Sequence, residues 1–100
     1  MKTIAVIESC DTKYKEAKFI SDFIKNEGLK ALVINTATGP APSYNYDISR
    51  EEIAESYGTP WQEMEPKSKG EKIDFMKEAV ASYVVKLYEE GKIDGIISVG

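Results

Sequence analysis

Three polar residues between a short apolar run and a helical pattern could hold a phosphate group. Asp11, Thr12 and Lys13 follow the run 3–7. The Thr12 hydroxyl and the first amides of a helix can bind phosphate oxygens, Lys13 adds a positive charge, and Asp11 could bind a ribose hydroxyl or a metal-bound water. An ordinary helix N-cap explains the same residues, because Asp and Thr accept hydrogen bonds from the first helical amides. The residue types leave both interpretations open.

Two further places could complete such a site. The stretch 35–46 holds Thr36, Gly39 and two prolines and has no regular periodicity, so we expect an ordered loop beside which a ribose or a base could lie. A turn that only covers a sheet edge would have the same composition. Gly100 directly follows a strand-like run, where Gly-rich phosphate turns begin in open α/β sheets. The predicted nucleotide-binding residues are Asp11, Thr12, Lys13, Thr36, Gly39 and Gly100.

The residue types that are missing exclude several kinds of chemistry. The chain has no histidine and one cysteine, Cys10, so it cannot build a Ser-His-Asp or Cys-His nucleophile or a Cys/His zinc site. It contains neither a Walker motif nor a complete Gly-x-Gly-x-x-Gly. Cys10 could be reactive near a helix N-terminus, or it could be a small buried residue. We predict no catalytic residue and no metal, and we do not expect catalysis from this stretch by itself.

Composition and charge indicate which cellular compartment and which classes of partner suit the protein. The net charge of −4 argues against binding to nucleic acid or to an anionic membrane, since both attract basic patches. No apolar run approaches the roughly 20 residues that cross a bilayer. A single cysteine suits a reducing compartment. We therefore expect a cytoplasmic protein.

The elements that would position the candidate residues follow from hydrophobic patterning. The runs 3–7 and 29–34 are short, nearly continuous and rich in β-branched residues, which is typical of strands in a parallel sheet. Between them a helical pattern ends at Gly28, which suits a helix C-terminus. The predicted buried stripe of this helix consists of Ala17, Ile20, Phe23 and Ile24.

Helix-start signals divide the second half of the chain. Capping boxes at 49–52 and 68–71 predict a short helix that ends at Gly58 and a long helix that ends at Gly91. Pro60 suits the first position of another helical turn between them. The long helix carries an apolar stripe made of Ile73, Met76, Ala79, Val80, Tyr83, Val84 and Leu87.

These elements predict an α/β fold with a parallel sheet. After a third strand at 93–99, the strand order 2-1-3 follows from right-handed crossovers, in a three-layer Rossmann- or flavodoxin-like arrangement. A helix of roughly 20 residues spans about 30 Å and a six-residue strand about 20 Å, so the long helix should overhang the sheet and its first turns need a further partner. Residues 1–100 are expected to form the N-terminal part of one domain, cut after its third strand.

Four matching stretches lie in this order along the chain: 4–7 with 11–13, 47–54, 70–71 with Met76, and 91–97. Together they resemble the little-characterised family of the tomato mosaic virus resistance protein. The resemblance implies an N-terminal domain that binds ATP, followed by a Gly-rich stretch and a later barrel-like domain, both absent from this chain. The sequence departs from the family at Tyr14, where Gly is usual, and at Lys69, where Arg is usual and offers a bidentate fork that Lys lacks.

Two functions are therefore expected. The first is the N-terminal part of a nucleotide-binding domain, with ATP as the expected ligand, which this stretch would bind weakly or not at all without its Gly-rich turn. The alternative is an oligomerisation or interaction module without its own ligand, because a three-stranded sheet leaves apolar surface open. A homodimer or a larger homo-oligomer is predicted under the second function and is compatible with the first.

Overall fold

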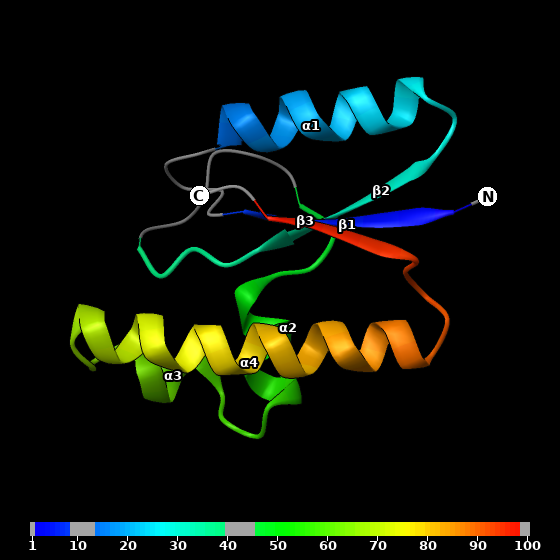
Figure 1. Cartoon of the computed structure of the whole chain (residues 1–100). Coiled ribbons are helices and arrows are strands. Elements are labelled where there is room, and N and C mark those ends of the chain that lie inside the picture. The colour runs from blue at the N-terminus through cyan, green and yellow to red at the C-terminus, as the bar shows by residue number, and fades with distance from the viewer. Residues whose placement is uncertain (1, 9–13, 40–45, 99–100) are drawn as a thin grey trace.

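A parallel sheet of three strands forms the middle layer of the protein. The structure is a computed structural model, which describes residues 2–8, 14–39 and 46–98. The order is β2-β1-β3, as the sequence predicts. Because all three strands run in the same direction, their carboxyl ends lie at one edge of the sheet (Figure 1). We call this edge, formed by the ends of the three strands, the carboxyl edge. The strands are β1 (Thr3–Glu8), β2 (Lys30–Asn35) and β3 (Gly95–Ser98).

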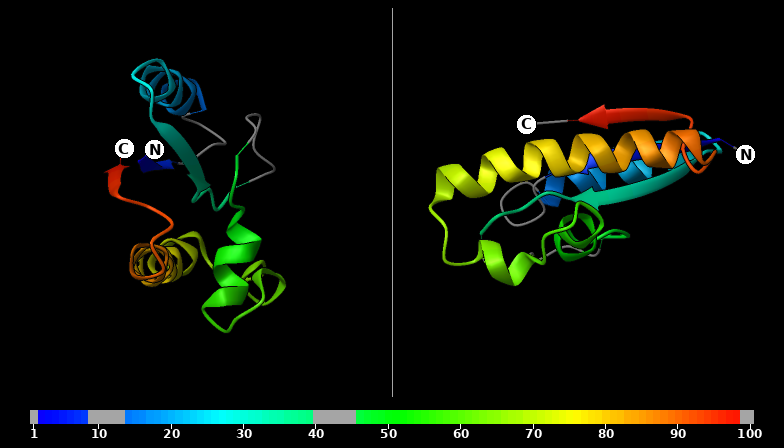
Figure 2. Two further views of the ribbon diagram at one scale, coloured as in Figure 1. Left: turned by 90° about the vertical axis from the view of Figure 1, so that its right-hand side faces the viewer. Right: turned by 90° about the horizontal axis from the view of Figure 1, so that it is seen from below.

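Helices cover both faces of the sheet and make three layers. One helix lies over one face, and the other three lie over the opposite face (Figures 1 and 2). The predicted α/β class with alternating strands and helices is confirmed. The helices are α1 (Tyr14–Asn26), α2 (Arg50–Ser56), α3 (Trp61–Met64) and α4 (Lys69–Glu89).

The helix α1 buries the predicted stripe in part: Ala17 and Ile24 are buried, and Ile20 is partly buried against the core under α1. Ala17, Ser21 and Ile24 face the sheet, whereas Phe23 is 59% exposed. Positions 17, 21 and 24 follow the four- and three-residue steps of one helix face, and Phe23 lies about 100° around the helix from Ile24. The prediction for Phe23 was therefore wrong, because the buried hydroxyl of Ser21 takes a position that hydrophobicity alone does not suggest.

The two predicted capping boxes both begin helices. The Glu52 N–H donates to the Ser49 hydroxyl oxygen at 3.1 Å, and the Glu71 N–H donates to the Ser68 hydroxyl oxygen at 3.2 Å. Pro60 precedes α3 as its N-cap rather than standing at its first position, since its backbone is extended with ψ 141°. This shifts the predicted start of that helix by one residue.

Two groups of buried side chains hold the layers together. Ile24 of α1 packs on Val6 and Val33 from one face of the sheet. The larger group joins Ala5 and Ile34 on the other face to α2, α3 and α4. The start of α4 extends beyond the strands, as predicted (Figure 1). Phe75, in the second turn of α4, meets the Tyr57 ring edge-on, with the ring centroids 5.7 Å apart. Tyr57, at the end of α2, thus contributes to the further partner that the overhanging turns of α4 require.

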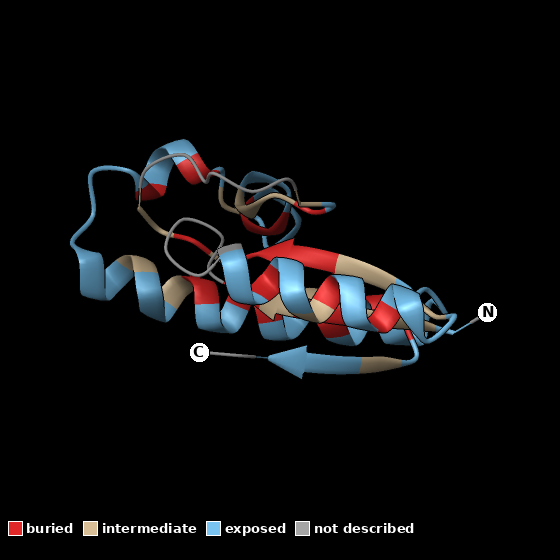
Figure 3. Ribbon diagram, turned by 90° about the horizontal axis from the view of Figure 1, so that it is seen from above, coloured by how far each residue is buried: buried red, intermediate tan, exposed pale blue. Residues whose placement is uncertain are grey.

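The third strand is shorter than predicted and its side chains are largely exposed. Ile93 is buried but precedes β3, which begins only at Gly95. The Asp94 carboxylate accepts a hydrogen bond from the Thr3 N–H at 2.8 Å, and the Asp94 N–H donates back to the Thr3 carbonyl. This exchange fixes the start of β3 beside the start of β1, while most of β3 remains exposed (Figure 3).

Candidate functional site

Two polar side chains end neighbouring strands at the carboxyl edge. Glu8 and Asn35 are opposite each other in the register of β1 and β2, and their exposed fractions are 2% and 1%. Because side chains alternate along a strand, both lie on the α1 face of the sheet, as do Val6 and Val33. Burying a carboxylate in a protein interior is costly, so a buried Glu8 at the edge where open α/β sheets bind their ligands marks a candidate site.

The loop after β2 is held against the end of β1. The Thr36 N–H donates to the Glu8 carbonyl at 3.1 Å, and the Asn35 side-chain oxygen accepts from the Ala37 N–H at 2.9 Å. Two predicted site residues, Thr36 and Gly39, lie on this loop and are half-buried. The structure therefore brings these two residues to the carboxyl edge, beside Glu8 and Asn35.

Arg50 attaches the same loop to the layer of α2 and α3. Its Nη1 donates to the carbonyl of Ala37 at 2.9 Å and to the carbonyl of Gly39. Its guanidinium carbon lies 4.7 Å from the centre of the Trp61 ring. The Nε atom is 3.2 Å from a carboxylate oxygen of Glu51. The position of the loop is thus fixed from both sides, by the sheet and by Arg50.

The chain also returns to cover the outer edge of β2. The Asp47 carboxylate accepts from the Val33 N–H at 2.7 Å, and the Asn35 N–H donates to the Ile48 carbonyl at 3.0 Å. These bonds place residues 46–48 beside β2, where Tyr46 packs on the core under α1. At the opposite edge of the sheet, and within the described part of the chain, β1 is the one strand that pairs with β3.

The other predicted site residues lie outside the described part of the chain. Asp11, Thr12, Lys13 and Gly100 are in this group, as is Cys10. The described elements on either side of 9–13 are the end of β1 at Glu8 and the start of α1 at Tyr14. Glu8, Asn35 and Arg50 were absent from the sequence prediction. A polar residue that ends a buried strand was the available signal for Glu8 and Asn35.

Three groups on or next to the helices have shifted pKa values. The negative charge of Glu78 raises the pKa of Tyr57, whose hydroxyl donates to that carboxylate at 3.3 Å. Desolvation raises the pKa of Tyr83, and a hydrogen bond from Lys18 lowers the pKa of Asp22. Among the described residues, no three acidic or cysteine side chains gather closely enough to hold a metal ion. No helix in the described part is long and apolar enough to cross a membrane.

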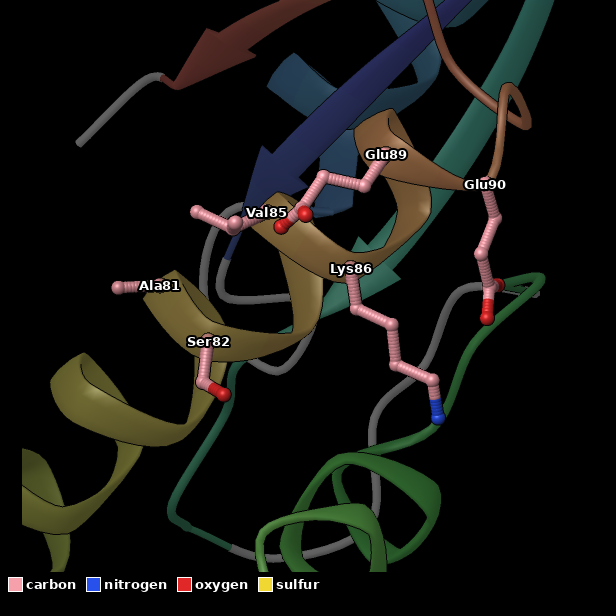
Figure 4. Close-up of a pocket in the computed structure, with 6 residues that line it drawn as sticks. All are labelled: Ala81, Ser82, Val85, Lys86, Glu89 and Glu90. Carbon is pink, nitrogen blue, oxygen red and sulfur yellow. The ribbon is translucent and has the colours of Figure 1, made fainter.

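A shallow hollow on the outer surface of α4 is not a convincing site. Its lining side chains come from α4 and from the C-cap residue Glu90, and the labelled ones do not converge on a common point (Figure 4). The carboxyl edge, in contrast, combines residues from two strands, a loop and α2. The hollow is lined by Ala81, Ser82, Val85, Lys86, Glu89 and Glu90.

A family model and the similar proteins found by comparison all carry the same family name. A family model described as "Uncharacterised protein family (UPF0261) N-terminal domain" matches residues 2–100. A UPF0261 protein of Clostridium tetani is 33% identical over 100 residues, which cover 99% of this chain and 25% of that protein. A UPF0261 protein of Brucella suis is 30% identical over 98 residues, or 97% of this chain and 23% of that protein. The chain thus spans about a quarter of the length of these relatives. No solved structure matches the chain.

Proposed function

The chain belongs to the uncharacterised protein family UPF0261, in the region of its N-terminal domain, and from this premise we propose that it is part of a nucleotide-binding domain whose ligand is ATP. The resemblance to the family of the tomato mosaic virus resistance protein, whose N-terminal domain binds ATP, supports this ligand. The activity of the whole protein would also depend on the other three quarters of the relatives' length.

One observation carries the proposal: polar groups gather at the carboxyl edge of a parallel sheet with strand order 2-1-3. In open α/β sheets ligands bind beyond the carboxyl ends of the strands, where the connections diverge to opposite faces. Here the order places that point between β1 and β3. The buried Glu8 and Asn35 end the strands β1 and β2 at the same edge.

The parts of a nucleotide would be shared among the residues of this edge. In the proposed arrangement, Thr12, Lys13 and the amides at the start of α1 bind phosphate, since a helix N-terminus and a lysine both favour an anion. Thr36 and Gly39 line the ribose or the base, and Asp11 accepts from a ribose hydroxyl. Gly100 is proposed as the first residue of a second phosphate-binding turn.

Calorimetric titration with ATP and ADP tests the proposal on two proteins. We expect the full-length Clostridium tetani relative to bind ATP and this chain to bind it more weakly, because the chain matches a quarter of that relative. Adenosine and inorganic phosphate, titrated separately, show which part of the nucleotide is bound. The absence of a binding heat for the relative with any nucleotide would contradict the proposal.

A second candidate function, assembly with another copy of the chain, is favoured by the exposed apolar edge strand. Ile96 and Ile97 of β3 are 50% and 38% exposed. They stand beside Ala5 and Val6 in the register and therefore lie on opposite faces of the sheet. An apolar strand with an open edge can pair with the same strand of a second copy about a two-fold axis. We propose this homodimer as compatible with nucleotide binding.

Light scattering over a range of protein concentrations tests the dimer. The chain of 11.1 kDa should show twice that mass, and Ile97→Lys should return it to the monomer, since a charge on an edge strand opposes pairing. Phe23→Lys, on the exposed side of α1, is the matched control and should leave the dimer intact. A monomer at every concentration would rule out this assembly.

A further inference from the structure

We infer that Arg50 is a positioning residue, which holds the loop 36–39 so that its Thr38 amide is presented to a ligand at the carboxyl edge. The ligand in this inference rests on the proposed nucleotide function. The positioning itself rests on contacts within the described residues. Arg50 is the only arginine in the chain, so its part in this arrangement can be tested without interference from another guanidinium group.

The Ala37 carbonyl bound by Arg50 determines which way one loop amide points. Nη1 accepts no hydrogen bond and donates to the carbonyls of Ala37 and Gly39. A trans peptide unit is planar, and its N–H points opposite to its C=O. The Thr38 N–H shares a peptide unit with the Ala37 carbonyl, and it is therefore directed away from Arg50. Fixing one carbonyl thus orients one hydrogen-bond donor.

The guanidinium group itself rests on a rigid surface. Trp61 is 5% exposed and belongs to the large core under the sheet, and its ring lies under the Arg50 guanidinium at 4.7 Å. The Arg50 side chain is only 11% exposed, so water competes little for its hydrogen bonds. A planar cation can stack on the ring and donate to both carbonyls together, whereas a lysine ammonium has no flat face to stack.

Hydrogen bonds from the same loop to the sheet also hold it in place. The Thr36 N–H is bound to the Glu8 carbonyl, and the Ala37 N–H is bound to the Asn35 side chain. Those two amides are therefore occupied by the protein. The Thr38 amide, turned away from Arg50, is the donor that we assign to the ligand. A phosphate or ribose oxygen is the kind of acceptor that a loop amide binds.

Arg50→Lys tests the inference, because it keeps the positive charge and removes the planar fork. Amide hydrogen exchange should become about tenfold faster at Thr36 and Ala37, whose N–H groups are hydrogen-bonded within the protein. ATP binding should weaken by about tenfold, the change that follows from losing one charge-assisted hydrogen bond. Glu51→Gln is the matched control. It removes only the exposed ion pair of Arg50 and should leave both quantities unchanged, since such pairs contribute little.

A second variant provides a readout that a purely structural role would not give. Arg50→Ala should lose ATP affinity, and added methylguanidinium should restore part of it by occupying the space over Trp61. The circular dichroism of each variant shows that it is folded. If Arg50→Ala does not fold, two measurements still test the inference. One is the loop exchange and ATP affinity of Arg50→Lys, and the other is the hydrogen exchange of the single arginine Nε–H in the unaltered chain.

The possible results separate the inference from the function on which it rests. Faster loop exchange with unchanged ATP affinity would overturn the positioning role and leave nucleotide binding standing. Unchanged loop exchange in Arg50→Lys would overturn it as well. If the unaltered chain and its full-length relative bind no nucleotide, the proposed function fails, even where faster exchange shows that Arg50 fixes the loop.

Discussion

Replacing Trp61 with alanine is expected to lower the free energy of unfolding by about 3–5 kcal/mol, the usual cost of removing a large buried aromatic ring. Trp61 is buried among the side chains of α2 and α4 and also lies under the Arg50 guanidinium. The substitution leaves a cavity in the larger core and removes the surface on which Arg50 rests. Since domains of this size have stabilities of about 5–15 kcal/mol, the loss is a large share of the total.

Urea denaturation followed by circular dichroism measures this loss. Fluorescence is unsuitable because Trp61 is the only tryptophan in the chain. The matched variant Trp61→Phe keeps an aromatic ring and most of the buried volume, so its cost should be clearly smaller. Equal stabilities for Trp61→Ala and the unaltered chain would mean that α3 does not pack on the core as described.

Ile34→Ala is expected to destabilise the chain by about 2–5 kcal/mol, because the side chain is fully buried in the larger core next to the carboxyl edge. The same change at Ile96, which is exposed on β3, should cost less than about 1 kcal/mol in the monomer. The pair compares one residue type in two environments of the same sheet. Thermal unfolding of both variants at low protein concentration gives the difference.

The Ile96→Ala variant also reports on assembly. If its cost rises with protein concentration, the edge of β3 is covered by a second copy, in agreement with the proposed dimer. If Ile34→Ala and Ile96→Ala cost the same at low concentration, the described arrangement of the sheet is contradicted. In that case β3 would be as well covered as β2.

Local patterns were sufficient to predict most of the fold. The apolar runs at 3–7 and 29–34, the capping serines at 49 and 68 and the glycines after the helices all act within a few residues. Gly58 and Gly91 have φ values of 95° and 74°, which glycine adopts without a Cβ clash. The error at Phe23 arose because hydrophobicity does not show which of two overlapping helix faces meets the sheet.

The candidate site was less predictable, because tertiary packing brings its residues together. The sequence analysis placed Thr36 and Gly39 on a loop at a sheet edge, and the structure agrees. Nothing local to Arg50 indicates that its guanidinium reaches the carbonyls of Ala37 and Gly39, more than ten positions earlier. Similarly, Glu8 meets Asn35 only through the register of β1 and β2. Such contacts depend on how the elements pack in three dimensions, and no short motif in the sequence indicates them.

An NMR titration of the ¹⁵N-labelled chain with ATP tests nucleotide binding at the carboxyl edge. Concentrations up to about ten times a Kd of roughly 1 mM detect even weak binding. We expect the largest shifts at the amides of Glu8, Thr36, Thr38 and Gly39. Binding should be weaker in Thr36→Val and unchanged in the control Thr59→Val. Shifts concentrated on the outer surface of α4 would contradict nucleotide binding at this edge, as would the absence of shifts here together with the absence of a binding heat for the full-length relative.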